Sequence, residues 1–192
     1  MLLAAWAAPA LVGLLQRPLL PIDETRYLTV AWEMWHGSWL VPHLNGRPYS
    51  DKPPLLFWLI DTGWLALGVQ EWWARLLPLL LALASLLLVR RLARRLWPER
   101  PAVAGLAPFV ALGAELWAAY QQLVLFDTLL TTCVLLGVTG TVEAWRAPRP
   151  GAWVLVALGL GLGVLAKGPV ALLHLLPLLL LAPWWMTADR RT

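Results

Sequence analysis

The sequence predicts an all-α integral membrane protein, with about six transmembrane helices and shorter juxtamembrane helices between the first two. Its 192 residues are 60% hydrophobic and only 14% charged, with a mean hydropathy of +0.67, which is outside the range of ordinary soluble domains. Several apolar runs approach the roughly 20 residues that a spanning helix needs. No internal repeat or low-complexity linker interrupts the chain, so we expect residues 1–192 to form a single transmembrane domain.

Six segments are expected to cross the membrane. The first resembles a secretory signal, but no basic residue precedes it and more apolar segments follow. The six are residues 2–15, 72–89, 101–120, 127–145, 151–166 and 170–186. A further apolar segment, residues 53–68, is shorter and carries Asp61 in its middle, so we interpret it as a helix lying in the interface.

Basic residues indicate how these spans are oriented. Those that follow the second, fourth and sixth spans fall on one side, which the positive-inside rule makes the cytoplasm. They are nine of the 15 lysines and arginines: Arg90, Arg91, Arg94, Arg95, Arg100, Arg146, Arg149, Arg190 and Arg191. We therefore expect a multi-pass protein of the inner (plasma) membrane with both termini in the cytoplasm. The formal charge of +4 has this local source and does not indicate nucleic-acid binding.

Cysteine chemistry is not indicated. Cys133 is the only cysteine and lies in an apolar run, so the sequence predicts no disulfide and no Cys/His metal signature. His43 stands alone beside an Asn45-Gly46 turn, and a metal role is its less favoured interpretation. We assign no cofactor, and a need for a divalent metal stays open.

The predicted topology carries the unusual polar residues to the outer face of the membrane. Ionisable groups that converge there from separate helices are expected of a functional site. These residues are Asp23, Arg26, Lys52, Glu115, Asp127, Lys167 and His174.

An amphipathic helix is expected to begin at Asp23, because apolar residues then recur every three or four positions. Its apolar face is predicted to comprise Leu28, Trp32, Trp35 and Trp39. From spacing alone, the favoured interpretation of Asp23 is a helix N-cap, and the alternative is a general base or a group that holds an acceptor hydroxyl. Arg26 is interpreted equally well as the partner of a surface acid or as a phosphate contact.

Two further acids also lie where helices are expected to begin. Asp51 precedes prolines suited to a first helical turn, and Asp127 opens an apolar run, so each could be a cap. Lys52 and Lys167 are the only lysines, and both lie at the predicted outer face. An ammonium group there can neutralise a phosphate at headgroup level, although snorkelling from a helix end explains Lys52 equally well.

The remaining assignments are structural. Tyr27 and the tryptophans are interpreted as interfacial anchors, and stacking on a sugar is the only chemistry assigned to them. Gly159 and Gly163 lie four residues apart and are expected to let a neighbouring helix approach closely. His174 is interpreted as a core histidine that bonds across helices.

Taken together, these residues resemble the GT-C membrane glycosyltransferases of the protein O-mannosyltransferase and lipid A aminoarabinose transferase superfamily. The matching stretches, in order, are residues 23–27, 39–46 and 51–58, then Asp127, then residues 167–169. The first loop is the most specific part. Members of the superfamily continue through several more membrane helices, so the resemblance covers only the N-terminal part of the usual fold and a truncated chain is expected.

The resemblance implies an enzyme with a polyprenyl-phosphate-linked sugar as donor and a lipid, glycan or protein as acceptor. Asp23 would be catalytic, with Asp127 as a second acidic participant. The residues implied in binding the donor or its lipid phosphate are Arg26, Lys52, Lys167 and Tyr27, with Glu24 and Asp51 in support. Residues 53–68 correspond to a juxtamembrane helix of the superfamily.

Two other functions compete with this one. A non-catalytic protein that binds or carries polyprenyl phosphate would need the same cations but no catalytic acid. A small transporter fits less well, because its polar groups would be expected near the middle of the bilayer and not at one face.

Overall fold

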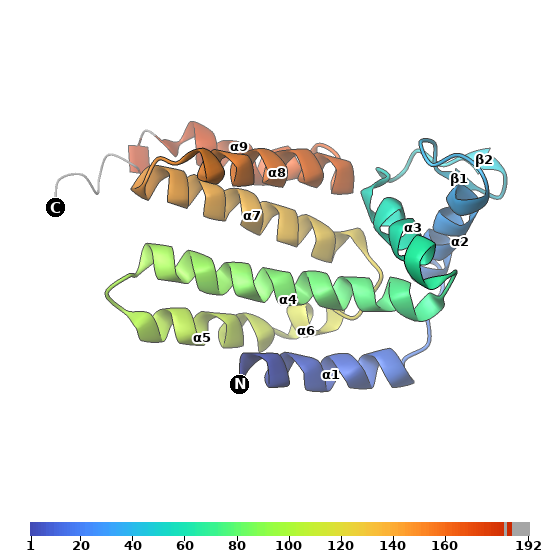
Figure 1. Cartoon of the computed structure of the whole chain (residues 1–192), viewed down its shortest axis with the longest axis horizontal. Helices are drawn as coiled ribbons and strands as arrows, with labels where there is room; N and C mark the ends of the chain where they lie inside the picture. Colours follow the sequence, from blue (N-terminus) through green and yellow to red (C-terminus); the bar gives the residue numbers. More distant parts are fainter. Residues whose placement is uncertain (183, 186–192) are drawn as a thin grey trace.

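The structure, a computed structural model, describes residues 1–182 and 184–185. This part of the chain is helical apart from one short hairpin (Figure 1). The helices are α1 (Leu2–Gln16), α2 (Asp23–His36), α3 (Leu55–Leu67), α4 (Glu71–Leu96), α5 (Pro101–Leu112), α6 (Glu115–Tyr120), α7 (Phe126–Arg146), α8 (Pro150–Lys167) and α9 (Val170–Leu180). The hairpin pairs β1 (His43–Leu44) with β2 (Arg47–Pro48) in antiparallel register.

Most of the helices form an elongated bundle. Figure 1 shows α1, α4, α5, α7, α8 and α9 running along its long axis, with α2, α3 and the hairpin gathered at one end. The α4–α5 and α7–α8 connections lie at the opposite end. The predicted all-α membrane fold is therefore confirmed, and the first loop forms a separate layer at one end of the bundle.

The lengths of the helices differ from the predicted spans. Only α4, α7 and α8, among the described helices, are long and apolar enough to cross a membrane by themselves, and α1, α5 and α9 are shorter. The prediction of one continuous helix over residues 101–120 is wrong, because α5 ends before Gly113 and α6 starts at Glu115. Glycine has a low helix propensity, which favours a break there. The predicted end of the last span at residue 186 lies outside the described residues.

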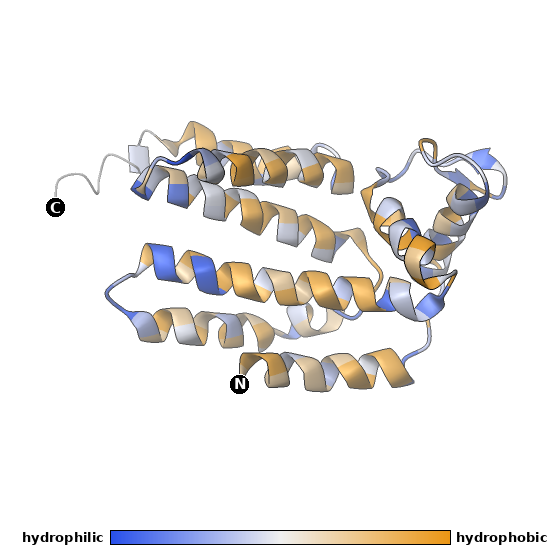
Figure 2. Ribbon diagram, in the orientation of Figure 1, coloured by the Kyte–Doolittle hydropathy of each residue, from blue (hydrophilic) through white to orange (hydrophobic). Residues whose placement is uncertain are grey.

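The second span is longer than predicted, because α4 continues through the arginines to Leu96. Arginine is a good helix former, and its charge is favourable at the negative end of the helix dipole. Figure 2 shows α4 as a largely hydrophobic helix with a hydrophilic end at the α4–α5 connection.

The helix α2 buries a different face from the predicted one. Its buried apolar residues are Tyr27, Val30, Ala31 and Met34, whereas Trp32 is 50% exposed. The periodicity was helical, but the tryptophans lie outside the most buried stripe. Small and medium side chains pack more closely against a protein neighbour, while tryptophan favours a wet membrane interface.

The layer of α2 and α3 shares its core with the ends of α4, α7 and α8. Phe57 of α3 packs edge-on against Phe126 of α7, with ring centroids 5.5 Å apart. Asp61 of α3 is fully buried, and neither of its carboxylate oxygens has a hydrogen-bond partner within the described residues. This burial raises the pKa of Asp61 to about 7. Core contacts thus hold α3 in place, and ionisation of the buried Asp61 destabilises this packing.

Glycines allow α7 and α8 to approach closely. A Cβ atom at Gly159 would lie 2.5 Å from the backbone nitrogen of Gly137, which is too close for any side chain. A Cβ atom at Gly163 would lie 2.8 Å from the Cβ atom of Ala171 in α9. The predicted packing role of both glycines is confirmed.

We predict that Gly159→Ala destabilises the bundle by about 1–3 kcal/mol, because the added methyl group forces two backbones apart. The matched control is Gly161→Ala on the same helix, where a Cβ atom meets nothing within 4 Å. The control variant should be as stable as the wild type or more stable, since alanine favours helix. Thermal unfolding in detergent measures both, and equal unfolding temperatures for the two variants would contradict the close contact.

We predict that Asp61→Asn stabilises the protein at neutral and alkaline pH. The folded protein keeps a proton on Asp61 up to about pH 7, while an unfolded chain loses it near the ordinary pKa of 3.8. The free energy of unfolding of the wild type should therefore fall as the pH rises from about 4 to about 7. The variant should match the wild type near pH 4 and unfold at a higher temperature above pH 7. If the stability of the two proteins changed with pH in the same way, ionisation of Asp61 would not destabilise the folded protein, and the prediction would be wrong.

Candidate active site

Asp23 and Arg26 form an ion pair in the first turn of α2. The guanidinium Nη2 of Arg26 donates a hydrogen bond of 2.5 Å to Oδ1 of Asp23. The Asp23 side chain is 53% exposed and that of Arg26 is 33% exposed. The pair therefore lies on an open surface, where a substrate can reach both groups.

The prediction that Asp23 caps α2 is wrong. The N-cap is Ile22, no side chain caps the helix, and Asp23 is its first helical residue. The caps proposed for Asp51 and Asp127 are wrong as well, because other residues stand at the N-cap positions of α3 and α7. Asp23, Asp51 and Asp127 therefore do not act as helix caps, although their spacing suggested it.

Ile22 has an uncommon backbone conformation, with φ 75° and ψ −69°. A β-branched residue with positive φ stores strain of about 1–3 kcal/mol, which persists only where the surroundings fix it. Tertiary contacts therefore fix the backbone at Ile22, and with it the position of Asp23 at the start of α2.

Glu24 supplies the strongest of these contacts. Its carboxylate is 1% exposed and accepts hydrogen bonds of 2.5 Å and 2.9 Å from the guanidinium group of Arg17. It also accepts the backbone N–H groups of Leu20 and Val124, each at 2.7 Å. Burial alone would raise the pKa of Glu24, but these hydrogen bonds outweigh it and the pKa lies below its usual value. Glu24 thus ties the start of α2 to the segment that leads into α7.

Tyr27 lies inside the core, so its interpretation as an interfacial anchor is wrong. It is 4% exposed and packs edge-on against Phe126, with ring centroids 5.0 Å apart. Burial raises the pKa of Tyr27, and a hydrogen bond with Arg26 partly offsets that rise. The negative charges of Asp23 and Asp127 raise the pKa further. The hydroxyl group therefore lies within electrostatic reach of both acids.

Tyr49 belongs to the same group, although it was not predicted from the sequence. It is 8% exposed, its hydroxyl group has no hydrogen-bond partner within the described residues, and its ring packs edge-on against Phe57. Burial raises the pKa of Tyr49; Arg26 lowers it, and Asp51 and Asp23 add to the rise. Its place two residues before Asp51 was the only available signal.

Asp127 and Lys167 form a second ion pair at this end of the bundle. Lys167 Nζ donates a hydrogen bond of 2.6 Å to Oδ1 of Asp127. The two side chains come from the start of α7 and the end of α8, and they are 47% and 27% exposed. Two accessible carboxylate–cation pairs therefore converge on the end of the bundle that carries α2 and α3.

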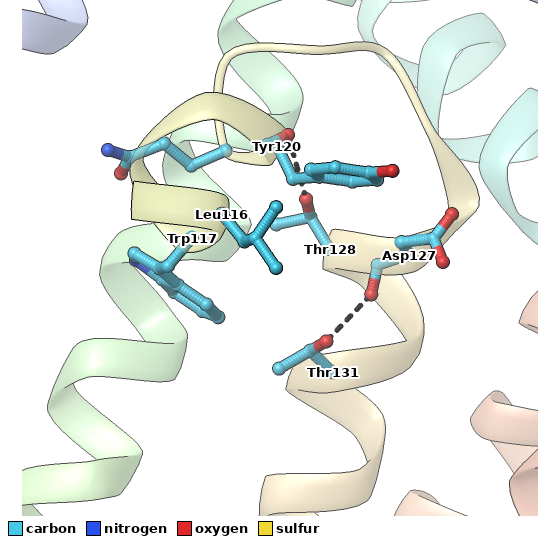
Figure 3. A pocket seen from close by; sticks show the side chains of 7 residues that line it. Leu116, Trp117, Tyr120, Asp127, Thr128 and Thr131 are labelled. Carbon is cyan, nitrogen blue, oxygen red and sulfur yellow. Dashed lines mark hydrogen bonds between the residues drawn. The ribbon is translucent and has the colours of Figure 1, made fainter. Parts of the chain in front are cut away.

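A cavity of about 310 Å³ opens beside Asp127 (Figure 3). It is lined by Leu116, Trp117 and Tyr120 from α6 and by Asp127, Thr128 and Thr131 from α7, and the carboxylate of Asp127 points away from Leu116 and Trp117. The dashed lines in Figure 3 mark hydrogen bonds from Thr131 Oγ1 to the Asp127 carbonyl and from Thr128 Oγ1 to the Tyr120 carbonyl. The helix α6 and the start of α7 thus line a mainly apolar hollow next to an acid.

Three other predicted residues lie outside these contacts. Lys52 is half-buried and makes no hydrogen bond or ion pair with any described residue. His43 bonds only to the nearby carbonyl of Val41. The prediction of a core histidine at 174 is wrong: His174 is exposed and bonds to Val170 within its own helix, because only one side of α9 packs against α7 and α8. Among the described residues no group of three or more His, Cys, Asp or Glu residues could hold a metal ion.

Comparison with known proteins gives consistent results. A family model described as dolichyl-phosphate-mannose-protein mannosyltransferase matches residues 51–191. An undecaprenyl phosphate-alpha-4-amino-4-deoxy-L-arabinose arabinosyl transferase of Pseudomonas savastanoi pv. phaseolicola is 32% identical over 195 residues, covering 100% of this chain and 36% of that protein. The corresponding transferase of Edwardsiella ictaluri is 32% identical over 175 residues, covering 88% of this chain and 31% of that protein.

Solved structures of ArnT from Cupriavidus metallidurans have the same fold. The structure bound to undecaprenyl phosphate matches with a TM-score of 0.83 and 25% identity, covering 95% of this chain and 36% of that one. The apo structure matches with a TM-score of 0.80 and 28% identity, covering 98% and 36%. The chain therefore spans about a third of the length of these relatives.

We predict that Glu24→Gln destabilises the protein by about 3 kcal/mol or more, because it leaves the buried guanidinium group of Arg17 without its counter-charge. The stabilisation by Glu24 is present at neutral pH and is lost as the pH falls below the ordinary value of 4.5, since the folded pKa is lowered. The control is Glu71→Gln, which removes an exposed carboxylate 3.4 Å from Arg75 and should cost about 1 kcal/mol or less, because Arg75 keeps its hydrogen bonds to the carbonyl groups of Gly13 and Arg17. Chemical denaturation in detergent measures the difference, and similar losses in both variants would contradict the role of Glu24.

Proposed function

We propose a glycosyl-transfer function for this chain, which belongs to the dolichyl-phosphate-mannose-protein mannosyltransferase family. In this proposal it moves a sugar from a polyprenyl-phosphate donor to an acceptor at the outer face of the inner membrane, with both termini in the cytoplasm. The observation that carries the proposal is the convergence of the Asp23–Arg26 and Asp127–Lys167 pairs beside the buried Tyr27.

The relatives suggest the donor. Those compared above are undecaprenyl phosphate-alpha-4-amino-4-deoxy-L-arabinose arabinosyl transferases, and one matching structure is bound to undecaprenyl phosphate. We therefore propose undecaprenyl phosphate-linked 4-amino-4-deoxy-L-arabinose as the donor, with residues 1–192 as one transmembrane domain that forms the N-terminal portion of a transferase.

The chemistry requires a proton acceptor and stabilisation of the leaving phosphate. Asp23 takes the proton from the acceptor hydroxyl, whose oxygen forms the new bond to the anomeric carbon of the sugar. The bond from that carbon to the phosphate oxygen breaks, and undecaprenyl phosphate departs with the electron pair. Asp127 holds the sugar or the acceptor from the opposite side of the site, where Lys167 fixes its position.

Cations stabilise the charge that develops on the phosphate. Lys52 is the best candidate for this task, because its ammonium group has no partner among the described residues. The guanidinium group of Arg26, in contrast, is paired with Asp23. Glu24 keeps its supporting role, because it ties the start of α2 to the segment before α7. Tyr27, which the resemblance implies in donor binding, instead takes a supporting role here, because its ring packs against Phe126 of α7. Asp51 adds negative charge near Tyr49.

We predict that Asp23→Asn lowers the turnover of donor by about 100-fold or more, which is the usual contribution of a general base. The measurement is the release of undecaprenyl phosphate from the proposed donor in membranes that contain the chain and an acceptor. Glu71→Gln removes an exposed acid at the same end of the bundle and should leave the turnover close to that of the wild type.

Three outcomes of this assay decide the proposal. Turnover that survives in Asp23→Asn while the variant inserts and folds would remove Asp23 from the chemistry. Binding of undecaprenyl phosphate that depends on Lys52, without any transfer by the wild type, would replace the enzyme by a lipid-binding or carrier protein. Loss of turnover in Asp23→Asn alone supports the enzyme.

A further inference from the structure

A second charged site lies at the opposite end of the bundle, and the proposed transfer reaction does not use it. Five arginines gather where α4 ends and α8 begins, at the hydrophilic end of α4 in Figure 2. They are Arg90, Arg91, Arg94, Arg95 and Arg149. Glu143 of α7 is the acid that lies among them in the part of the chain that the structure describes.

Glu143 organises two of these arginines. Its carboxylate is 4% exposed and accepts hydrogen bonds of 2.7 Å and 2.8 Å from Nε and Nη2 of Arg91. It also accepts one of 3.1 Å from Nε of Arg95, one turn further along α4. Two guanidinium groups are thus held side by side in fixed positions, and each keeps N–H donors that Glu143 does not use.

Two hollows adjoin this cluster and share Arg91 and Arg95. One of about 470 Å³ is lined by Arg90, Arg91, Arg94 and Arg95 together with Leu87, and another of about 310 Å³ includes Arg149 and Leu155. The Leu87 side chain is 47% exposed. Each hollow therefore combines guanidinium donors with an apolar wall at the edge of the hydrophobic part of the bundle.

Orientation of the chain in the membrane does not account for these features. The positive-inside rule depends on the number of lysines and arginines near the spans and requires no defined arrangement. Here a buried glutamate of α7 instead orients two arginines of α4 in a defined arrangement. Guanidinium groups bind phosphate through paired hydrogen bonds, and basic pockets between helices at the membrane surface suit lipid headgroups.

We propose that this arginine site binds the headgroup of an anionic phospholipid, with its phosphate on the arginines and an acyl chain along Leu87 or Leu155. Arg91 and Arg95 are positioned by Glu143. Arg90 and Arg94 are exposed and have no side-chain partner among the described residues, so they are free to close on the phosphate.

The test compares lipid binding by two double variants that lose the same charge. In Arg90→Gln/Arg94→Gln the ion pairs of Glu143 stay intact, while Arg47→Gln/Arg100→Gln removes two exposed arginines that line neither hollow. The chain is purified in detergent and titrated with dioleoylphosphatidylglycerol or dioleoylphosphatidylcholine, and bound lipid is counted by native mass spectrometry. Inorganic phosphate is then added as a competitor.

The wild type and the control pair should bind phosphatidylglycerol in preference to phosphatidylcholine. Arg90→Gln/Arg94→Gln should weaken that binding at least about tenfold, because it removes two charge-assisted contacts. If both double variants bound phosphatidylglycerol equally weakly, the binding would depend on the total surface charge and not on this site, and the proposal would be overturned. Displacement of the lipid by an equal concentration of phosphate would also overturn it, since the acyl chain would then contribute nothing.

Discussion

The buried carboxylate of Glu24 is the interaction on which the first-loop layer depends. It joins three segments: the end of α1 through Arg17, the loop before α2 through Leu20, and the entry to α7 through Val124. Arg75 of α4 strengthens the same junction by donating to the carbonyl groups of Gly13 and Arg17. Because a buried charge without its partners is costly, the layer has one stable position on the bundle. The placement of Asp23 and Arg26 follows from it, because both residues lie beside Glu24 in the first turn of α2.

The sequence was sufficient for the all-α membrane fold and for the gathering of Asp23, Arg26, Asp127 and Lys167 at one end of the bundle. Long apolar runs and clustered arginines are strong signals, because crossing a bilayer leaves little freedom in length or polarity. It also indicated that Asp127 and Lys167 lie on one side. That they touch depends on how α7 and α8 pack, which the close approach at Gly159 makes possible.

Finer details were not accessible in this way. A helix cap depends on the position of a single residue. The N-caps are Ile22 and Leu125, so Asp23 and Asp127 lie in the first turns of α2 and α7. The buried face of α2 depends on which neighbours it meets, so Tyr27 became a core residue. Tyr49 was missed because its burial comes from the aromatic cluster around Phe57, which joins parts of the chain that are distant in sequence.

The length of α7 has a consequence for the surrounding lipid. This helix carries Asp127 in its first turn and Glu143 in its last, 16 positions later, which at the rise of an α-helix places them about 24 Å apart. The hydrocarbon core of a typical bilayer is about 30 Å thick, and tilting the helix only shortens its reach. A hydrocarbon core of ordinary thickness therefore extends past at least one of these two acids, and their ion pairs with Lys167 and with Arg91 and Arg95 offset the cost of placing a charge there.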